Sequence, residues 1–179
     1  SSNLFILAFW MIHIHPEVKV RLLEEIKSIF GNLLNRRITN EDLDNLKYLD
    51  AVIKETNRIQ PIVPVSGRDL STSSDTIAGY KFDSRASFFI NNLYIHRHED
   101  YWREPNKFMP ERFLNDKIVK NSYVPFGGGI RICPGKLSAM TQIKTLLILF
   151  LMKYNVELVD KETPLQRIYA GLNLYPCLM

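Results

Sequence analysis

A ten-residue segment, Phe126-Gly-Gly-Gly-Ile-Arg-Ile-Cys-Pro-Gly135, combines a thiol, a cation and a run of glycines. Thiolates are stabilised at helix N-termini and beside cations, and an apolar helix is expected from Pro134 onward, directly after Cys133. Three consecutive glycines allow backbone conformations and close approaches that side chains forbid. Arg131 can hold a carboxylate through two parallel hydrogen bonds. The segment therefore predicts a site in which one thiolate binds a metal.

Two phosphate-binding patterns do not fit the glycines. A P-loop needs a glycine, four residues, then Gly-Lys and Ser or Thr. Five residues separate Gly129 from the Gly-Lys pair at 135–136, and Leu137 follows that pair. A dinucleotide-binding fingerprint that starts at Gly127 would need glycine at position 132, where isoleucine stands. The spacing of the glycines therefore excludes both phosphate-binding patterns.

A zinc site is also disfavoured, because no further Cys or His lies at ligand spacing from Cys133. A haem offers an iron to the sulfur of Cys133 and propionates to Arg131. The remaining alternative is a buried thiol on an ordinary glycine turn. That alternative accounts for the cysteine but not for the loop as a whole.

The loop resembles the signature of the cytochromes P450, Phe-x-x-Gly-x-Arg-x-Cys-x-Gly. Every fixed position matches, at Phe126, Gly129, Arg131, Cys133 and Gly135. The resemblance implies that Cys133 is the axial thiolate ligand of a haem iron and that the other four residues form its haem-binding loop. A thiolate ligand of this kind favours cleavage of the O–O bond.

A second pair of motifs supports the resemblance. Glu55-Thr-Asn-Arg58 places opposite charges three residues apart, which alone is typical of a surface ion pair of little energetic value. The family pairs such a motif with a Pro-Glu-Arg-Phe segment, and this chain has that segment at 110–113. The resemblance implies a structural triad of Glu55, Arg58 and Arg112, since buried charges persist only when they satisfy one another.

Two further residues acquire expected roles from the resemblance. Arg68 lies ten residues after Arg58, an interval that leads in many family members to an arginine bound to a haem propionate. The competing interpretation of Arg68 is an exposed arginine at the end of a strand. His96 belongs to a stretch similar to the family's His-Arg-Asp segment, and we expect it to be packed or hydrogen-bonded, not an iron ligand.

The elements expected to position these residues are mostly helices. Residues 3–30 are predicted to be helical with a break at His15, where Pro16 fits the first turn of a second helix that Gly31 ends. Thr39 supplies a cap for a further helix that runs to about Ile59. The stretch from 137 to 154 predicts a strongly apolar helix.

Short strands are predicted at 76–77, 80–82 and 87–90 and in the tail from 156 to 179, with a short helix at 91–97. Residues 82–85 depart from the family's usual Pro-x-Gly turn, which predicts a longer turn between two strands. The expected fold class is mainly α with a minor β part. By resemblance this is the C-terminal portion of the cytochrome P450 fold, with residues 1–179 part of a single domain.

Composition excludes several classes of protein. The chain has 179 residues, 46% of them hydrophobic and 23% charged, which is typical of a globular protein. The net charge is +4, and the basic residues are scattered along the chain, unlike the clustered basic stripe of a nucleic-acid surface. A docking face for an acidic electron donor remains compatible with this charge. Two cysteines are too few for a disulfide framework, and Cys177 is expected to be a buried small hydrophobe. The longest apolar run, 4–12, is too short to span a bilayer.

The resemblance covers essentially all of the chain, which is less than half of a usual family member. We therefore expect a C-terminal portion that lacks the membrane anchor and most of the distal helix and is inactive when isolated. The implied partners are O2, an apolar small-molecule substrate and an NADPH-dependent reductase or other electron donor, and the implied location is the cytoplasmic face of the endoplasmic reticulum membrane. Substrate contacts are expected from Ile62 to Ser66 and from the turn at Ala170 to Leu172.

Three functions remain compatible with the sequence. The first is a monooxygenase that uses O2 and reductase-supplied electrons. The second is a haem-thiolate isomerase or dehydratase that acts on peroxides without a reductase. The third is a non-catalytic haem-binding protein, which the triad and Arg131 argue against, because a haem sensor has no need of such a scaffold.

Overall fold

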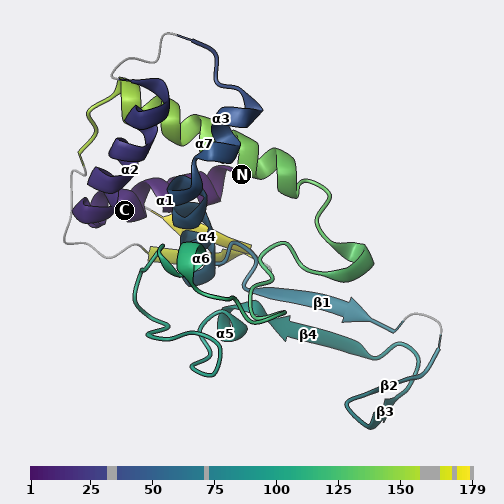
Figure 1. Cartoon of the computed structure of the whole chain (residues 1–179). Coiled ribbons are helices and arrows are strands. Elements are labelled where there is room, and N and C mark those ends of the chain that lie inside the picture. Colours follow the sequence, from purple (N-terminus) through teal and green to yellow (C-terminus); the bar gives the residue numbers. More distant parts are fainter. Residues whose placement is uncertain (32–35, 71–72, 158–165, 171–172, 178–179) are drawn as a thin grey trace.

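The computed structural model describes residues 1–31, 36–70, 73–157, 166–170 and 173–177, the last two ranges as backbone only. In these residues helices predominate, and the strands form three separate antiparallel pairs. The prediction of a mainly α fold with a minor β part is therefore confirmed. Figure 1 shows the helices gathered in one body, with the ribbon of β1 and β4 projecting from it.

The first two helices follow the predicted boundaries. Helix α1 spans Ser2–Ile14 and α2 spans Pro16–Phe30, with His15 between them in a non-helical conformation. Pro16 occupies the first turn of α2, where its missing N–H is not needed. Gly31 ends the helix with a φ of 71°, a left-handed conformation that glycine adopts without steric cost.

The predicted single helix from Thr39 to Ile59 is wrong in one respect. Thr39 does form a capping box with Asp42, but the helix that it caps, α3, is only Asn40–Asn45. The chain turns at Leu46 and a new helix, α4, runs over Lys47–Ile59. The cause lies on α2, where the carboxylate of Glu25 accepts hydrogen bonds from the backbone N–H groups of Tyr48 and Leu49, at 2.6 and 2.9 Å. A side chain far away in sequence thus caps the second helix.

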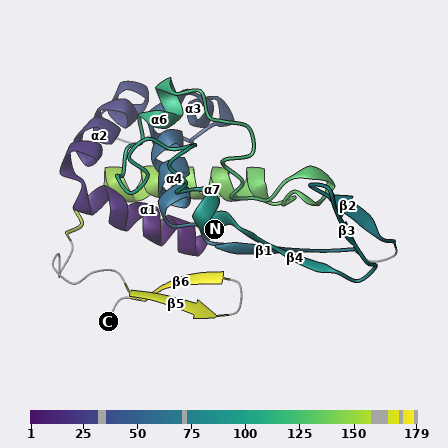
Figure 2. The ribbon, with the colours of Figure 1, turned by 90° about the horizontal axis from the view of Figure 1, so that it is seen from below.

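The strands form a long ribbon and a short hairpin. Strand β1 (Val65–Asp69) pairs with β4 (Ser87–Asn91), and β2 (Asp75–Ile77) pairs with β3 (Tyr80–Phe82) at the far end of that ribbon, as Figures 1 and 2 show. The sequence did not predict β1, because Pro64 and Gly67 interrupt its strand pattern. The connection from β3 to β4 is a longer turn, as predicted, and Arg85 within it has a φ of 74°.

The remaining elements are short, apart from the last helix. Helix α5 is Asn92–Ile95, α6 is Arg112–Asn115, and a 3-10 turn, η1, covers Gly129–Arg131. Helix α7 spans Lys136–Lys153. In the predicted tail, β5 (Gln166–Ala170) pairs with β6 (Asn173–Cys177). Residues 158–165, 171–172 and 178–179 of that tail and the side chain of Cys177 lie outside the described part.

The core lies where α1, α2, α4 and α7 meet, and Figure 2 shows α1 and α4 stacked against α7. Its fully buried members include large aliphatic side chains from all four helices, each worth about 1.5–3 kcal/mol on burial: Ile12, Leu22, Ile26, Leu49, Ile53, Ile143, Leu147 and Ile148. This packing fixes the end of α4 and the start of α7 relative to each other. None of the helices formed by the described residues combines the length and apolar character needed to cross a membrane.

Candidate functional site

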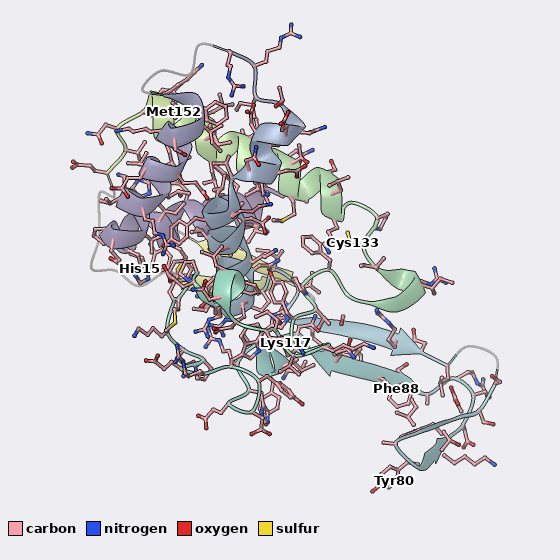
Figure 3. All side chains as sticks on the ribbon, in the orientation of Figure 1. His15, Tyr80, Phe88, Lys117, Cys133 and Met152 are labelled. Atoms are coloured by element: carbon pink, nitrogen blue, oxygen red, sulfur yellow. The ribbon has the colours of Figure 1, made fainter. Side chains whose placement is uncertain are left out.

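The cysteine loop is a tight turn ahead of α7. The backbone N–H of Cys133 donates to the carbonyl of Phe126, at 2.9 Å, which closes the loop. Gly127 and Gly129 have φ values of 75° and 65°, so this course of the backbone is strained for any residue with a side chain. Helix α7 begins at Lys136, between the two starts that the sequence indicated, Pro134 and Leu137. The thiol of Cys133 is exposed on the loop between η1 and α7 (Figure 3).

A cavity of about 360 Å³ lies against this loop, next to a second one of about 800 Å³ that Phe126, Gly127 and Cys133 also line. Four of the sequence-predicted cofactor residues line the first cavity: Arg68, Phe126, Arg131 and Cys133. Gly129 and Gly135 are not lining residues, and they shape the loop instead. The rest of the wall is predominantly apolar and includes Leu4, Ile62, Val63, Ala139 and Ile143.

Arg68 comes to this cavity from the ribbon. It lies inside β1, opposite Phe88, half-buried and not at the strand's end. Its Nη1 donates to the carbonyl of Gly67, at 2.7 Å, and a Cβ added at Gly127 would lie 3.5 Å from its Nη2. The guanidinium therefore lies beside the glycine loop, on the same cavity as Arg131 although the two residues are far apart in sequence.

The expected substrate-contact segment reaches the same cavity in part. Ile62, Val63 and Ser66 line it. Asn92, fully buried beneath this segment, donates from Nδ2 to the carbonyl of Val63, at 3.0 Å, and so holds the segment in place. Positions 171 and 172 of the second expected contact lie outside the described residues.

Away from the cavity, Glu55, Arg58 and Arg112 form a buried ion cluster. Arg58 at the end of α4 binds Glu55 through Nε and Nη2, at 2.7 and 2.9 Å, and Arg112 of α6 donates through Nε to the same carboxylate, at 3.0 Å. The three residues are 0%, 0% and 2% exposed. The backbone N–H of Met109 adds a further hydrogen bond to Glu55, at 2.9 Å. A single carboxylate thus serves two guanidinium groups.

The other guanidinium nitrogens of the cluster hold the irregular segment 96–112. Arg58 donates to the carbonyls of His96, Pro105 and Lys107. Arg112 donates to the carbonyls of Arg103 and Glu104, and it shares the carbonyl of Lys107 with Arg58. The ring of Trp102 packs against both cations, with its centroid 5.0 Å from Cζ of Arg58 and 5.9 Å from Cζ of Arg112. The cluster therefore fastens a loop without regular hydrogen bonds to the end of α4.

Sequence reasoning missed the network that joins this cluster to the cysteine loop. His96 is buried and hydrogen-bonded, as predicted, with Nε2 accepting from the N–H of Val124 at 3.0 Å. Burial first, and then the Arg58 guanidinium, lower the pKa of His96 to about 4, against a smaller opposing effect of the Asn57 backbone. Tyr123 donates from its hydroxyl to the carbonyl of Lys54, and burial raises its pKa. No motif in the sequence signals either contact.

Comparison with known proteins agrees with this geometry. The family model described as Cytochrome P450 matches residues 1–174. The chain belongs to the cytochrome P450 family. Similar curated proteins include Cytochrome P450 4d1 of Drosophila melanogaster, 35% identical over 169 residues, and Cytochrome P450 4V2 of Rattus norvegicus, 36% identical over 161 residues. Tabersonine 6,7-epoxidase isoform 2 of Catharanthus roseus is 35% identical over 154 residues.

These alignments cover most of this chain and a smaller share of each relative. They include 92%, 88% and 84% of the chain and 33%, 30% and 29% of the respective relatives. The chain thus spans about a third of the length of the curated P450 relatives it matches. Cytochromes P450 are generally haem-thiolate monooxygenases, and these relatives all come from eukaryotes.

The residues around the cavity fit the haem that membership of the P450 family implies. One sulfur, two guanidinium groups and an apolar wall match the iron, the propionates and the macrocycle of that group. Among the residues that the structure describes, no three His, Cys, Asp or Glu side chains gather into a metal site. Cys133 is therefore suited to act as a single protein donor to a metal that is already held in a larger cofactor.

Proposed function

We propose that this chain forms the thiolate side of a cytochrome P450 monooxygenase that inserts one oxygen atom from O2 into an apolar organic substrate. The observation that carries the proposal is a shared cavity. Cys133 and Arg131 reach it from one loop, and Arg68 reaches it from a separate part of the chain. An ordinary glycine turn with a structural cysteine would not need two cations at the same cavity. When bound, a haem with an axial thiolate would supply the chemistry that cleaves the O–O bond.

The roles of the individual residues follow from their chemistry. Cys133 would provide the axial thiolate, and Arg131 and Arg68 would bind the propionates, since guanidinium groups hold carboxylates bidentately. Phe126 covers the loop side of the cavity, and Gly129 allows the backbone path of the loop. Gly135 lies beside the thiol, since a Cβ at this position would be 3.8 Å from Sγ of Cys133.

The apolar residues of the wall would exclude water and favour an apolar substrate. Ile62, Val63 and Ser66 would contact that substrate, since they line the same cavity as the thiol. Residues 1–179 would then be part of a single P450 domain, braced by the Glu55–Arg58–Arg112 cluster.

The partners of the proposed reaction are O2, the substrate and an NADPH-dependent reductase or other electron donor. The family and the eukaryotic relatives support a location at the cytoplasmic face of the endoplasmic reticulum membrane. The proposed monooxygenase needs a reductase, whereas a peroxide isomerase of the same family does not. The discriminating assay is turnover with NADPH, reductase and O2 compared with turnover of an organic peroxide in the absence of reductase.

The axial role of Cys133 is tested by substitution in the protein expressed from its complete coding sequence. Cys133→Ser should abolish the thiolate-type Soret band of the reduced carbon-monoxide complex, because a serine oxygen does not replace a thiolate as donor. The matched control is Cys177→Ser, which removes the other cysteine of this chain and should leave the band intact. A thiolate-type band that persists in Cys133→Ser would refute the proposal.

A further inference from the structure

His96 uses both its backbone and its ring to join separate parts of the structure. It follows the last residue of α5 and is fully buried. Its carbonyl accepts a hydrogen bond from Nη1 of Arg58, at 2.7 Å, which ties it to the buried ion cluster. Its ring nitrogen Nε2 accepts from the N–H of Val124, at 3.0 Å, and its ring packs 5.3 Å from that of Tyr123.

Val124 is the first residue of the turn that opens the cysteine loop. Its carbonyl accepts from the N–H of Gly127, at 3.0 Å. The carbonyl of Phe126, inside that turn, accepts from the N–H of Cys133, at 2.9 Å. A series of hydrogen bonds therefore runs from Arg58 through His96 to Val124 and the turn at Val124–Gly127. Phe126 of that turn accepts the hydrogen bond from the N–H of Cys133.

We propose that His96 is a positioning residue that fastens the cysteine loop to the buried Glu55–Arg58–Arg112 cluster and acts only as a neutral hydrogen-bond acceptor. This inference rests on the proposed function, because it assigns to His96 the task of holding Cys133 where a haem iron can be bound. His96 itself does not contact the cavity-lining thiol, so its effect is exerted through Val124 and the loop.

The acceptor role requires the unprotonated ring. A protonated imidazole carries hydrogen on both nitrogens, and Nε2 could then no longer accept from Val124. The charged and titratable groups next to His96 are Arg58 of α4, which donates to its carbonyl and is itself paired with Glu55, and Tyr123 of the segment before the loop, whose ring lies 5.3 Å from the imidazole. The Arg58 cation disfavours a second positive charge on the neighbouring imidazole. Burial acts in the same direction and keeps the ring neutral at ordinary pH.

The test uses two variants of the protein expressed from its complete coding sequence. His96→Phe keeps a planar ring against Tyr123 but has no acceptor nitrogen. His96→Gln offers an amide oxygen in the place of Nε2 and cannot be protonated. The control is His98→Phe, two positions further along, where the side chain is 29% exposed and its ring packs against those of Tyr94 and Tyr101.

The readout is the share of reduced carbon-monoxide complex that has the thiolate-type Soret band, measured at equal haem content. At neutral pH we expect His96→Phe to lose at least half of that share, His96→Gln to retain most of it and His98→Phe to match the wild type. On acidification, the wild type should lose the band at a higher pH than His96→Gln, because only the wild type can gain a proton at this position.

The outcomes separate the two proposals. If the wild type shows the thiolate-type band, and His96→Phe and His96→Gln match it both at neutral pH and on acidification, the role of His96 is refuted while the proposed function stands. If His96→Phe does not fold, the acid profile of His96→Gln decides alone, and a midpoint equal to that of the wild type refutes the role. A wild type without the band overturns both proposals.

Discussion

Removal of the Glu55 carboxylate is expected to be the most damaging single change in the buried cluster. Glu55 accepts four hydrogen bonds, three from the guanidinium groups of Arg58 and Arg112 and one from the backbone of Met109. Glu55→Ala would leave two buried cations without a counter-ion, whereas Arg58→Ala or Arg112→Ala would leave one cation paired with one carboxylate. Breaking a buried pair by removing one partner costs about 3–5 kcal/mol. Glu55→Ala should fall at the upper end of this range, and the arginine variants lower within it.

A loss of this size is a large fraction of the about 5–15 kcal/mol that holds a typical protein folded. We therefore expect each single variant to be poorly folded and to retain little haem. The combined Glu55→Ala and Arg58→Ala change should cost much less than the sum of its parts, because the second substitution removes a cation that the first has left unpaired.

The assay is urea unfolding followed by circular dichroism, together with haem content, on the protein expressed from its complete coding sequence. Glu104→Ala is the matched control, since it breaks an exposed ion pair with Lys107 at the same spacing of three residues. That pair should contribute less than about 1 kcal/mol. The reasoning would be refuted if Glu55→Ala cost no more than this control, or if the double variant were simply additive.

Three further changes test other parts of the structure. Glu25→Ala should lower the free energy of unfolding by about 1–2 kcal/mol, because it uncaps α4 at Tyr48 and Leu49, and Glu24→Ala on the same helix should change urea unfolding little. The pKa of His96 is about 4 in the folded state against 6.5 in the unfolded state, so the unfolded state binds the proton more tightly and stability falls as pH decreases from 6.5 towards 4. Between pH 7 and pH 5 the free energy of unfolding should fall by about 2 kcal/mol in the wild type because of His96, and this contribution should be missing in His96→Gln. Urea unfolding that depends on pH equally in the two proteins would contradict this prediction. Residues 1–179 expressed alone should aggregate and show no substrate oxidation with a reductase, because large apolar side chains such as Ile130 and Leu137 are 100% and 79% exposed. A soluble monomer that binds haem stoichiometrically would disprove this.

Several features were determined by short stretches of sequence. Pro16 and Gly31 set the limits of α2, and Thr39 with Asp42 sets the start of α3, because caps are formed by residues a few positions apart. The cysteine loop also belongs to this group, since its glycines, arginine and thiol lie within one continuous segment. These local signals were sufficient to predict most of the helices, and they carry the prediction of the site's chemistry.

Only the tertiary structure decided the features that depend on residues far apart in the chain. The break at Leu46 depends on a carboxylate from α2, and β1 exists because β4 supplies its hydrogen bonds despite Gly67. Arg68 likewise lines the cavity of Cys133 only because the β1–β4 ribbon packs beside the cysteine loop. A sequence pattern records which groups can donate, accept or be buried, but their partners are chosen when packing brings distant segments together. The contact of His96 with Val124 is of this kind, because nothing in either segment's own pattern calls for the other.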